Sequence, residues 1–227
     1  MSYKIAVYAI CKNEINYVQS WLDSMSEADY ICVLDTGSTD GTYEALQAAG
    51  IIVEQRTISP WRFDTARNES MKLIPEDTDI CVSVDLDEVF EPGWAQTLRN
   101  IWKPEMGMIR YYYISTHTAT GAEGKVFYRD KIHANIPSLY FWRYAIHEVL
   151  NRDFEAPLYC TKDIICHHFQ NTNTSRKNYL DLLELEYKEN PDARNLYNYA
   201  RELYIYERYE EARSEEHTSE LQSPNTI

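Results

Sequence analysis

Short apolar runs alternate with helix-like segments in the N-terminal part of this chain, and that alternation limits its fold more than any other feature. The apolar runs are rich in β-branched and aromatic residues: Tyr3–Ile10 (YKIAVYAI), Tyr30–Leu34 (YICVL) and Asp79–Val84 (DICVSV). The helix-like segments are Ile15–Met25, Thr39–Ala49 and Phe63–Ile74. Strands that alternate with helices at this spacing predict a parallel sheet with helices on its faces.

The remainder of the chain changes character twice. Residues 107–136 are tyrosine-rich, with Gly121 and Gly124 between strand-like pieces, which predicts antiparallel strands and a loop. Long helices follow, at Thr174–Glu189 and Asp192–Tyr206, and a third begins near Arg208. The stretch Asn190–Ala212 resembles about one tetratricopeptide repeat, and one such repeat cannot bury its apolar faces alone.

These patterns divide the chain into three parts. Since domains usually run to roughly 100 to 200 residues, 227 residues can hold one core and a small appendage. We expect an α/β domain over residues 1–172 and a helical, tetratricopeptide-like fragment over 173–212. The segment Arg213–Ser223 (RSEEHTSELQS) resembles the conceptual translation of a common short-read sequencing adapter. We therefore expect residues 213–227 to be an artefact that takes no part in the fold.

The net charge of −14 limits the partners that the chain can bind. So acidic a protein, with no basic run, would repel a polyphosphate backbone, which argues against nucleic acid as a partner. A small diphosphate would need a cation to be held here. The charge balance therefore favours a metal-assisted site over a purely protein-made anion site.

The sequence also predicts a cytoplasmic protein. It has neither a charged-then-apolar leader nor a run near 18 apolar residues, so we expect no signal peptide and no transmembrane segment. Its five cysteines include no CxxC pair, and three lie in or beside apolar runs, as buried reduced thiols do.

Polar clusters follow the three apolar runs. They are Cys11–Glu14 (CKNE), Asp35–Asp40 (DTGSTD) and Asp85–Glu88 (DLDE). Ligands of open α/β sheets bind at the carboxyl ends of the strands, so these clusters are where chemistry is expected.

The pair Asp85 and Asp87 lies at the end of the third run, where two carboxylates two residues apart can face one point. Hard oxygen ligands of this kind suit Mg²⁺ or Mn²⁺. In the second cluster, Asp35 could accept hydrogen bonds from a base or ribose, Gly37 lets the backbone approach a ligand, and Ser38 or Thr39 could cap the next helix.

Taken together, these motifs resemble the family 2 glycosyltransferases. That resemblance implies the GT-A fold, a Rossmann-like α/β fold with a mostly parallel sheet and helices on both faces, here followed by a short α-helical repeat segment. It also implies a nucleotide-diphosphate sugar as donor and Mn²⁺ or Mg²⁺ as cofactor. The residues that it places against the donor are Asn13, Glu14, Asp35, Asp85 and, from the segment Trp61–Asn68, Arg67; it places the metal on Asp87. The family usually has Asp-Asp where this chain has Asp35-Thr36.

A narrower resemblance is to the subgroup that joins this domain to tetratricopeptide-like helices and includes bacteriocin S-glycosyltransferases. It matches His147-Glu148 to a His-Glu pair after the antiparallel strands, and His167 or His168 to a later histidine. By this likeness Glu148 is the candidate base, and His147, His167 and His168 are candidate metal-side residues. The family implies transfer with inversion, while the acceptor stays open between a peptide, a glycan and a lipid-linked saccharide. The C-terminal helices would bind a protein partner or a second copy.

Two alternatives remain open from the sequence. In one, the chain is a catalytically inactive scaffold that binds partners through its helices. In the other, Asp85–Val89 (DLDEV) is the nucleophile box of a haloacid-dehalogenase-like phosphatase, in which the first aspartate is phosphorylated. That box normally follows the first strand of its domain, whereas two strand and helix units precede it here.

Overall fold

The computed structural model describes residues 2–103, 105–115, 123–136, 138–152, 154–155, 159–169 and 179–213. The expected domain boundary at 172/173, Gly121, and all of the expected artefact except Arg213 lie outside these ranges.

The helices and strands confirm the alternation that the sequence predicts. The strands are β1 (Ile5–Cys11), β2 (Tyr30–Asp35), β3 (Ile52–Gln55), β4 (Ile80–Ser83), β5 (Glu88–Phe90), β6 (Met108–Ile114), β7 (Val126–Ala134), β8 (Tyr140–Arg143), β9 (Val149–Arg152) and β10 (Tyr159–His168). The helices are α1 (Ile15–Met25), α2 (Thr42–Ala48), α3 (Phe63–Met71), α4 (Trp94–Ile101), α5 (Tyr179–Glu189) and α6 (Ala193–Ile205).

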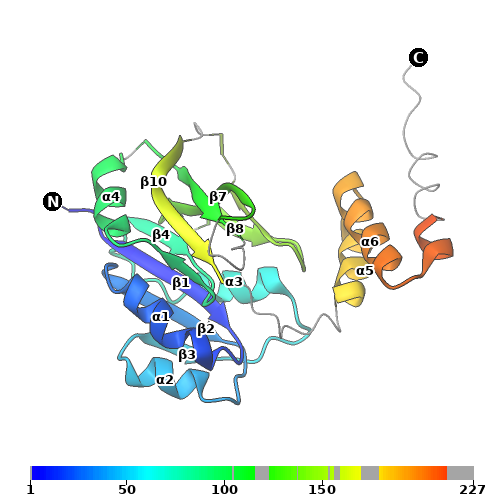
Figure 1. Ribbon diagram of the computed structural model, residues 1–227, viewed down its shortest axis with the longest axis horizontal. Coiled ribbons are helices and arrows are strands. Elements are labelled where there is room, and N and C mark those ends of the chain that lie inside the picture. The colour runs from blue at the N-terminus through cyan, green and yellow to red at the C-terminus, as the bar shows by residue number, and fades with distance from the viewer. Residues whose placement is uncertain are drawn as a thin grey trace.

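One large sheet organises the described residues, in the order β3-β2-β1-β4-β7-β6-β10-β5, with β8 and β9 as a separate pair (Figure 1). Strands β3, β2, β1 and β4 are parallel. Strand β7 then runs antiparallel to both β4 and β6, as the tyrosine-rich region predicted. The carboxyl ends of β1, β2 and β4 therefore meet at one edge of the sheet, and the three polar clusters follow them there.

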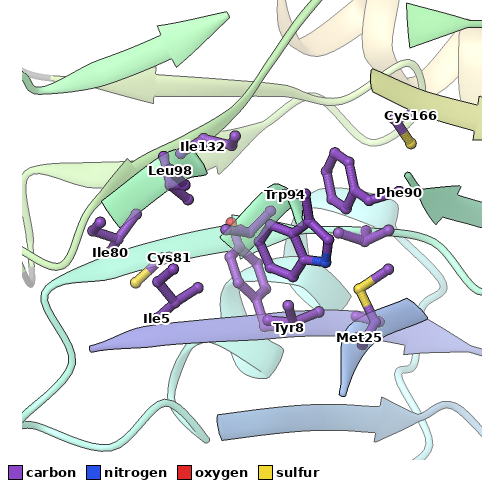
Figure 2. Close-up of a cluster of buried hydrophobic side chains, with 14 of the residues drawn as sticks. Ile5, Tyr8, Met25, Ile80, Cys81, Phe90, Trp94, Leu98, Ile132 and Cys166 are labelled. Carbon is purple, nitrogen blue, oxygen red and sulfur yellow. The ribbon is translucent and has the colours of Figure 1, made fainter. Parts of the chain in front are cut away.

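The core explains why these segments take up these elements. Every residue of β1 is buried, as expected of a central parallel strand covered on both faces. Helix α1 buries Val18, Trp21 and Met25, which share one helical face. Figure 2 shows Trp94 of α4 at the centre of the buried cluster, and its ring stacks on that of Phe90 at 4.8 Å. Four cysteines are buried and Cys160 is exposed, and none of the five forms a disulfide.

The expected cap of α2 is wrong. Neither Ser38 nor Thr39 caps that helix, because its N-cap is Gly41, at a φ of 96°. Asp40 accepts the backbone N–H of Thr42 instead, at 3.0 Å. The hydroxyl of Ser38 is used elsewhere, in the site described below.

Helices α5 and α6 form a pair at one end of the molecule (Figure 1). They are packed on each other and on Ala145 and Ile146 of the α/β part, through Leu182, Leu183, Tyr199 and Leu203. Asp192 caps α6 by accepting the backbone N–H of Asn195 at 2.8 Å. A short helical stretch, 209–213, follows where a third helix was expected. Among the described residues, every helix is too short or too polar to span a bilayer.

Candidate active site

Asn13 joins the loops that follow β1 and β2. Its backbone N–H donates to the hydroxyl of Ser38 at 2.8 Å, and its side-chain oxygen accepts the backbone N–H of Thr39, also at 2.8 Å. Asn13 has a φ of 57°, a left-handed conformation that asparagine tolerates better than most residues. The two loops therefore form one rim at the edge of the sheet.

Asp35 is fully buried and organises the same rim. Its Oδ1 accepts the backbone N–H groups of Gly37 and Ser38 at 2.9 and 2.8 Å, and the side-chain amide of Gln55 at 2.9 Å. Burial opposes the charged form, but the hydrogen bonds from Ser38, Gln55 and Gly37 outweigh it and lower the pKa of Asp35. Gly37 has a φ of 106°, which explains the glycine at this position.

Asp85 lies just beyond the end of β4, between two cations. Its Oδ1 pairs with Arg67 Nη2 at 2.8 Å, and its Oδ2 pairs with Lys131 Nζ at 2.9 Å. Burial raises its pKa, but the charges of Arg67 and Lys131 outweigh that effect and hold the pKa of Asp85 well below its usual range. Both carboxylate oxygens of Asp85 are thus engaged by protein groups.

Glu88 supports the acidic turn from inside the protein. Its side chain is 2% exposed. It accepts the backbone N–H of Asp85 at 3.0 Å and the hydroxyl of Tyr113 at 2.6 Å. Lys131 Nζ lies 3.4 Å from both of its oxygens. This set fixes the conformation of the turn that carries Asp85 and Asp87.

Asp87 meets His168 across the site, with 3.1 Å between Oδ2 and Nε2. The other ring nitrogen of His168, Nδ1, lies 3.2 Å from the carbonyl oxygen of Ser115. The hydrogen bond with Asp87 raises the pKa of His168 more than burial lowers it. An imidazole held through Nδ1 by a backbone carbonyl, with Nε2 beside a carboxylate, is how proteins orient a metal-binding histidine.

Glu14 is crowded by the acidic turn. Burial, followed by the charges of Asp87 and Asp85, raises its pKa to about 8. Its Oε2 is buried and has no hydrogen-bond partner in the part of the chain that the structure describes. A water or an ion commonly satisfies a buried oxygen of this kind.

Together these groups fit a divalent cation. Mg²⁺ and Mn²⁺ prefer oxygen and imidazole ligands, and Mg²⁺ commonly binds through one or two carboxylates plus substrate phosphates rather than in an all-protein cage. In the described ranges, no group of three or more His, Cys, Asp or Glu side chains is arranged to hold a metal ion by itself. Asp87 and His168 would supply the protein ligands, and the carboxyl group of Glu14 lies close enough for the charge of Asp87 to raise its pKa.

Arg67 is the central cation of the site, 5% exposed. Its Nε donates to Glu148 Oε1 at 2.6 Å, its Nη1 donates to Ser83 Oγ at 3.3 Å, and its guanidinium lies 4.8 Å from the ring of Trp142. Burial opposes its charge, but Asp85 and Glu148 outweigh that effect and raise its pKa further. Arg67 therefore positions Asp85 and Glu148 relative to each other.

The two other candidate histidines lie in different surroundings. Successive residues of a strand point to opposite faces, so His167 and His168 of β10 face different surroundings. His167 Nε2 lies 2.9 Å from Glu91 Oε1. The His147 ring lies 6.1 Å from that of Tyr179, and its backbone carbonyl accepts a hydrogen bond from Arg194. Of the three histidines, His168 is the one that contacts Asp87.

Sequence reasoning did not find Lys131 or Tyr113, and it placed Glu88 in the third polar cluster without assigning it a role. Lys131 is the last of three consecutive charged residues in the run VFYRDKIHA, which looks half solvated. The only signal was its place two residues before His133, on the same face of a strand whose second half is buried.

Comparisons with known proteins bear on the family and the fold. The Glycosyl transferase family 2 profile matches residues 6–141, more than half of the chain. The search of curated proteins found no match to this chain.

Three solved structures represent the structural matches. The mannosyltransferase PcManGT from Pyrobaculum calidifontis, in complex with GDP-Man and Mn²⁺, is 14% identical with a TM-score of 0.55, covering 81% of this chain and 62% of that one. TarS from S. aureus is 13% identical with a TM-score of 0.50, and the match covers 82% of this chain and 39% of TarS. Glucosyl-3-phosphoglycerate synthase from Mycobacterium tuberculosis, in complex with Mn²⁺ and UDP-glucose, is 25% identical with a TM-score of 0.41, covering 49% and 44%.

This chain spans less than two thirds of the length of each of these proteins. The likeness to PcManGT supports the fold expected from the sequence, an α/β GT-A fold with helices at its C-terminal end. The profile match begins within β1 and ends within β8, and it includes the three polar clusters and Arg67. The chain belongs to glycosyl transferase family 2.

Proposed function

We propose that this protein transfers a sugar from a nucleotide-diphosphate sugar to an acceptor, with a divalent cation, Mn²⁺ or Mg²⁺. The observation that carries the proposal is the edge of the sheet where Asp87 and His168 lie together beside the buried, unpartnered oxygen of Glu14. Family membership supports the donor class. A cation bound here would neutralise the charge that develops on the leaving diphosphate.

The protein side chains have separate roles in this proposal. Asp87 and His168 would hold the cation, and Glu14 lies near Asp87. Asn13 and Asp35 shape the rim that receives the nucleoside, because they fix the loops after β1 and β2. Asp85, Lys131 and Arg67 balance charge at the base of the site.

Glu148 is the proposed general base. It pairs with Nε of Arg67, whose Nη2 pairs with Asp85. A carboxylate there would accept the proton of an incoming acceptor as it attacks the anomeric carbon, and attack opposite the leaving diphosphate inverts that carbon. His147, which precedes Glu148, would help to hold that base near the cation.

Donor hydrolysis tests the proposal. Purified protein is incubated with a panel of nucleotide-sugars in Mn²⁺, in Mg²⁺ and in chelator, and the release of nucleotide is measured. Cation-dependent release from at least one donor is expected, since glycosyltransferases often transfer sugar slowly to water. If no donor is hydrolysed or bound under any condition, the chain is an inactive scaffold and the proposal fails.

A further inference from the structure

The turn that carries His147 and Glu148 has an unusual backbone. Tyr144 and His147 have φ values of 84° and 55°. Non-glycine residues rarely adopt such conformations, which persist only where the surrounding structure holds them. Something outside the turn must therefore fix it.

Helix α5 provides one of these contacts. Glu186 is 1% exposed, and its carboxylate accepts the backbone N–H of Ala145 and the side-chain amide of Asn190. A carboxylate is rarely buried to this extent unless its hydrogen bonds are needed. Ala145 in turn accepts the backbone N–H of Phe63 at 2.9 Å, so the turn is held between α5 and the start of α3.

Helix α6 provides the other contact through Arg194. Its Nη2 donates to the backbone carbonyl of His147 at 2.8 Å, and its guanidinium lies 4.6 Å from the Tyr144 ring. One side chain therefore contacts both residues that have positive φ. Between them, Ala145 and Ile146 are buried against α5 and α6.

We propose that Glu186 and Arg194 are positioning residues of the active site, and that the α5–α6 pair holds the His147–Glu148 turn in the conformation that presents Glu148 to Arg67. The helical pair is then part of the catalytic unit rather than an appendage for partners. This inference rests on the proposed function, because it gives the turn a catalytic purpose.

Three variants of the full chain test it. Arg194→Met removes the donor to His147, and Arg194→Lys keeps a cationic donor. Glu189→Ala is the matched control, because Glu189 also ties α5 to the catalytic part, through Arg62 at 2.7 Å, without touching the turn. The measurements are single-turnover rate, donor affinity, and hydrogen exchange of the amides of residues 144–148.

Arg194→Met is expected to slow single turnover by about 10- to 100-fold, the size of effect that a misplaced catalytic group produces. Donor affinity should be unchanged, exchange at 144–148 should quicken, Arg194→Lys should recover part of the rate, and Glu189→Ala should match wild type. The inference is overturned if Arg194→Met turns over like wild type, or if it and Glu189→Ala lose rate equally. If the wild-type protein binds and hydrolyses no donor, the proposed function fails, and unchanged exchange in Arg194→Met would separately refute the holding role.

Discussion

Arg67 and Glu148 stand 81 positions apart in the sequence, yet Arg67 Nε donates to Glu148 Oε1 at 2.6 Å. The same guanidinium binds Asp85 Oδ1 at 2.8 Å. Arg67 therefore connects the acidic turn, where a cation would bind, with the turn that carries the proposed base. Several consequences of that connection can be measured.

Removing Arg67 should destabilise the fold. Arg67→Met would leave Asp85 and Glu148 without their shared cation, and breaking a buried ion pair in this way typically costs about 3 to 5 kcal/mol. Urea unfolding measures the loss. The control is Arg110→Met, whose partner Asp130 is 38% exposed; exposed pairs contribute about 0 to 1 kcal/mol. Similar losses in the two variants would show that Arg67 does not have this role.

Asp87 and His168 should be needed for cation-dependent donor binding. Asp87→Asn and His168→Ala are each expected to abolish the Mn²⁺-dependent rise in melting temperature that a bound nucleotide-sugar produces, because binding stabilises only the folded state. His167→Ala is the matched control, since His167 contacts Glu91 instead. If Asp87→Asn kept the full Mn²⁺-dependent rise in melting temperature, the cation would have to bind to other residues.

Glu148→Gln should slow turnover by about 10² to 10⁴-fold, the usual contribution of a general base, while donor affinity changes little. If the acceptor is a thiol, the loss should be smaller and should shrink as pH rises, because the thiolate forms by itself. Single-turnover rates at several pH values measure this, with Asp130→Asn as the control acid. Equal rates in wild type and Glu148→Gln at every pH would assign the proton transfer to another residue.

The stability of the fold should depend on pH through His133. This side chain is 1% exposed. Burial lowers its pKa from 6.5 to about 4. Its Nδ1 lies 2.9 Å from the Ala134 carbonyl, and its Nε2 lies 3.0 Å from Tyr8 Oη. The folded state therefore favours the neutral ring, with Nδ1 donating and Nε2 accepting.

The unfolded chain takes up a proton at His133 near pH 6.5, whereas the folded chain does so only near pH 4. The contribution of neutral His133 to the free energy of unfolding is thus complete above pH 6.5. It falls by roughly 3 kcal/mol as the pH falls towards 4. The free energy of unfolding is measured from pH 7.5 to 4 in wild type and in His133→Asn. The difference in free energy of unfolding between wild type and His133→Asn should become smaller as pH falls. A difference that is constant with pH would refute the prediction.

The parallel half of the fold could be predicted because its signals are local. A strand such as β1, buried on both faces, is written as a continuous apolar run, and the polar residues that follow each such strand mark the edge where ligands bind. The sequence analysis did not predict strand β10, because the polar residues Thr161–Asp163 interrupt its apolar run. Its partner strands β6 and β5 lie far away in the sequence.

The candidate site could be predicted only in part for a similar reason. Asp85 and Asp87 are two residues apart in sequence, so their motif is visible, but the cations that pair with Asp85 come from α3 and β7. Which of His167 and His168 faces Asp87 depends on the register of β10 against β5, which no local pattern gives. The contact of Arg194 with the His147–Glu148 turn likewise depends on tertiary packing.

The most direct test of the account is titration calorimetry of the full chain with a panel of nucleotide-diphosphate sugars, in Mn²⁺ and in chelator, for wild type and Asp87→Asn. The account predicts saturable binding of at least one donor to the wild type in Mn²⁺, with that binding lost in chelator and in the variant. Binding of equal affinity in all three conditions would contradict the proposed cation site, and no binding of any donor would contradict the proposed activity.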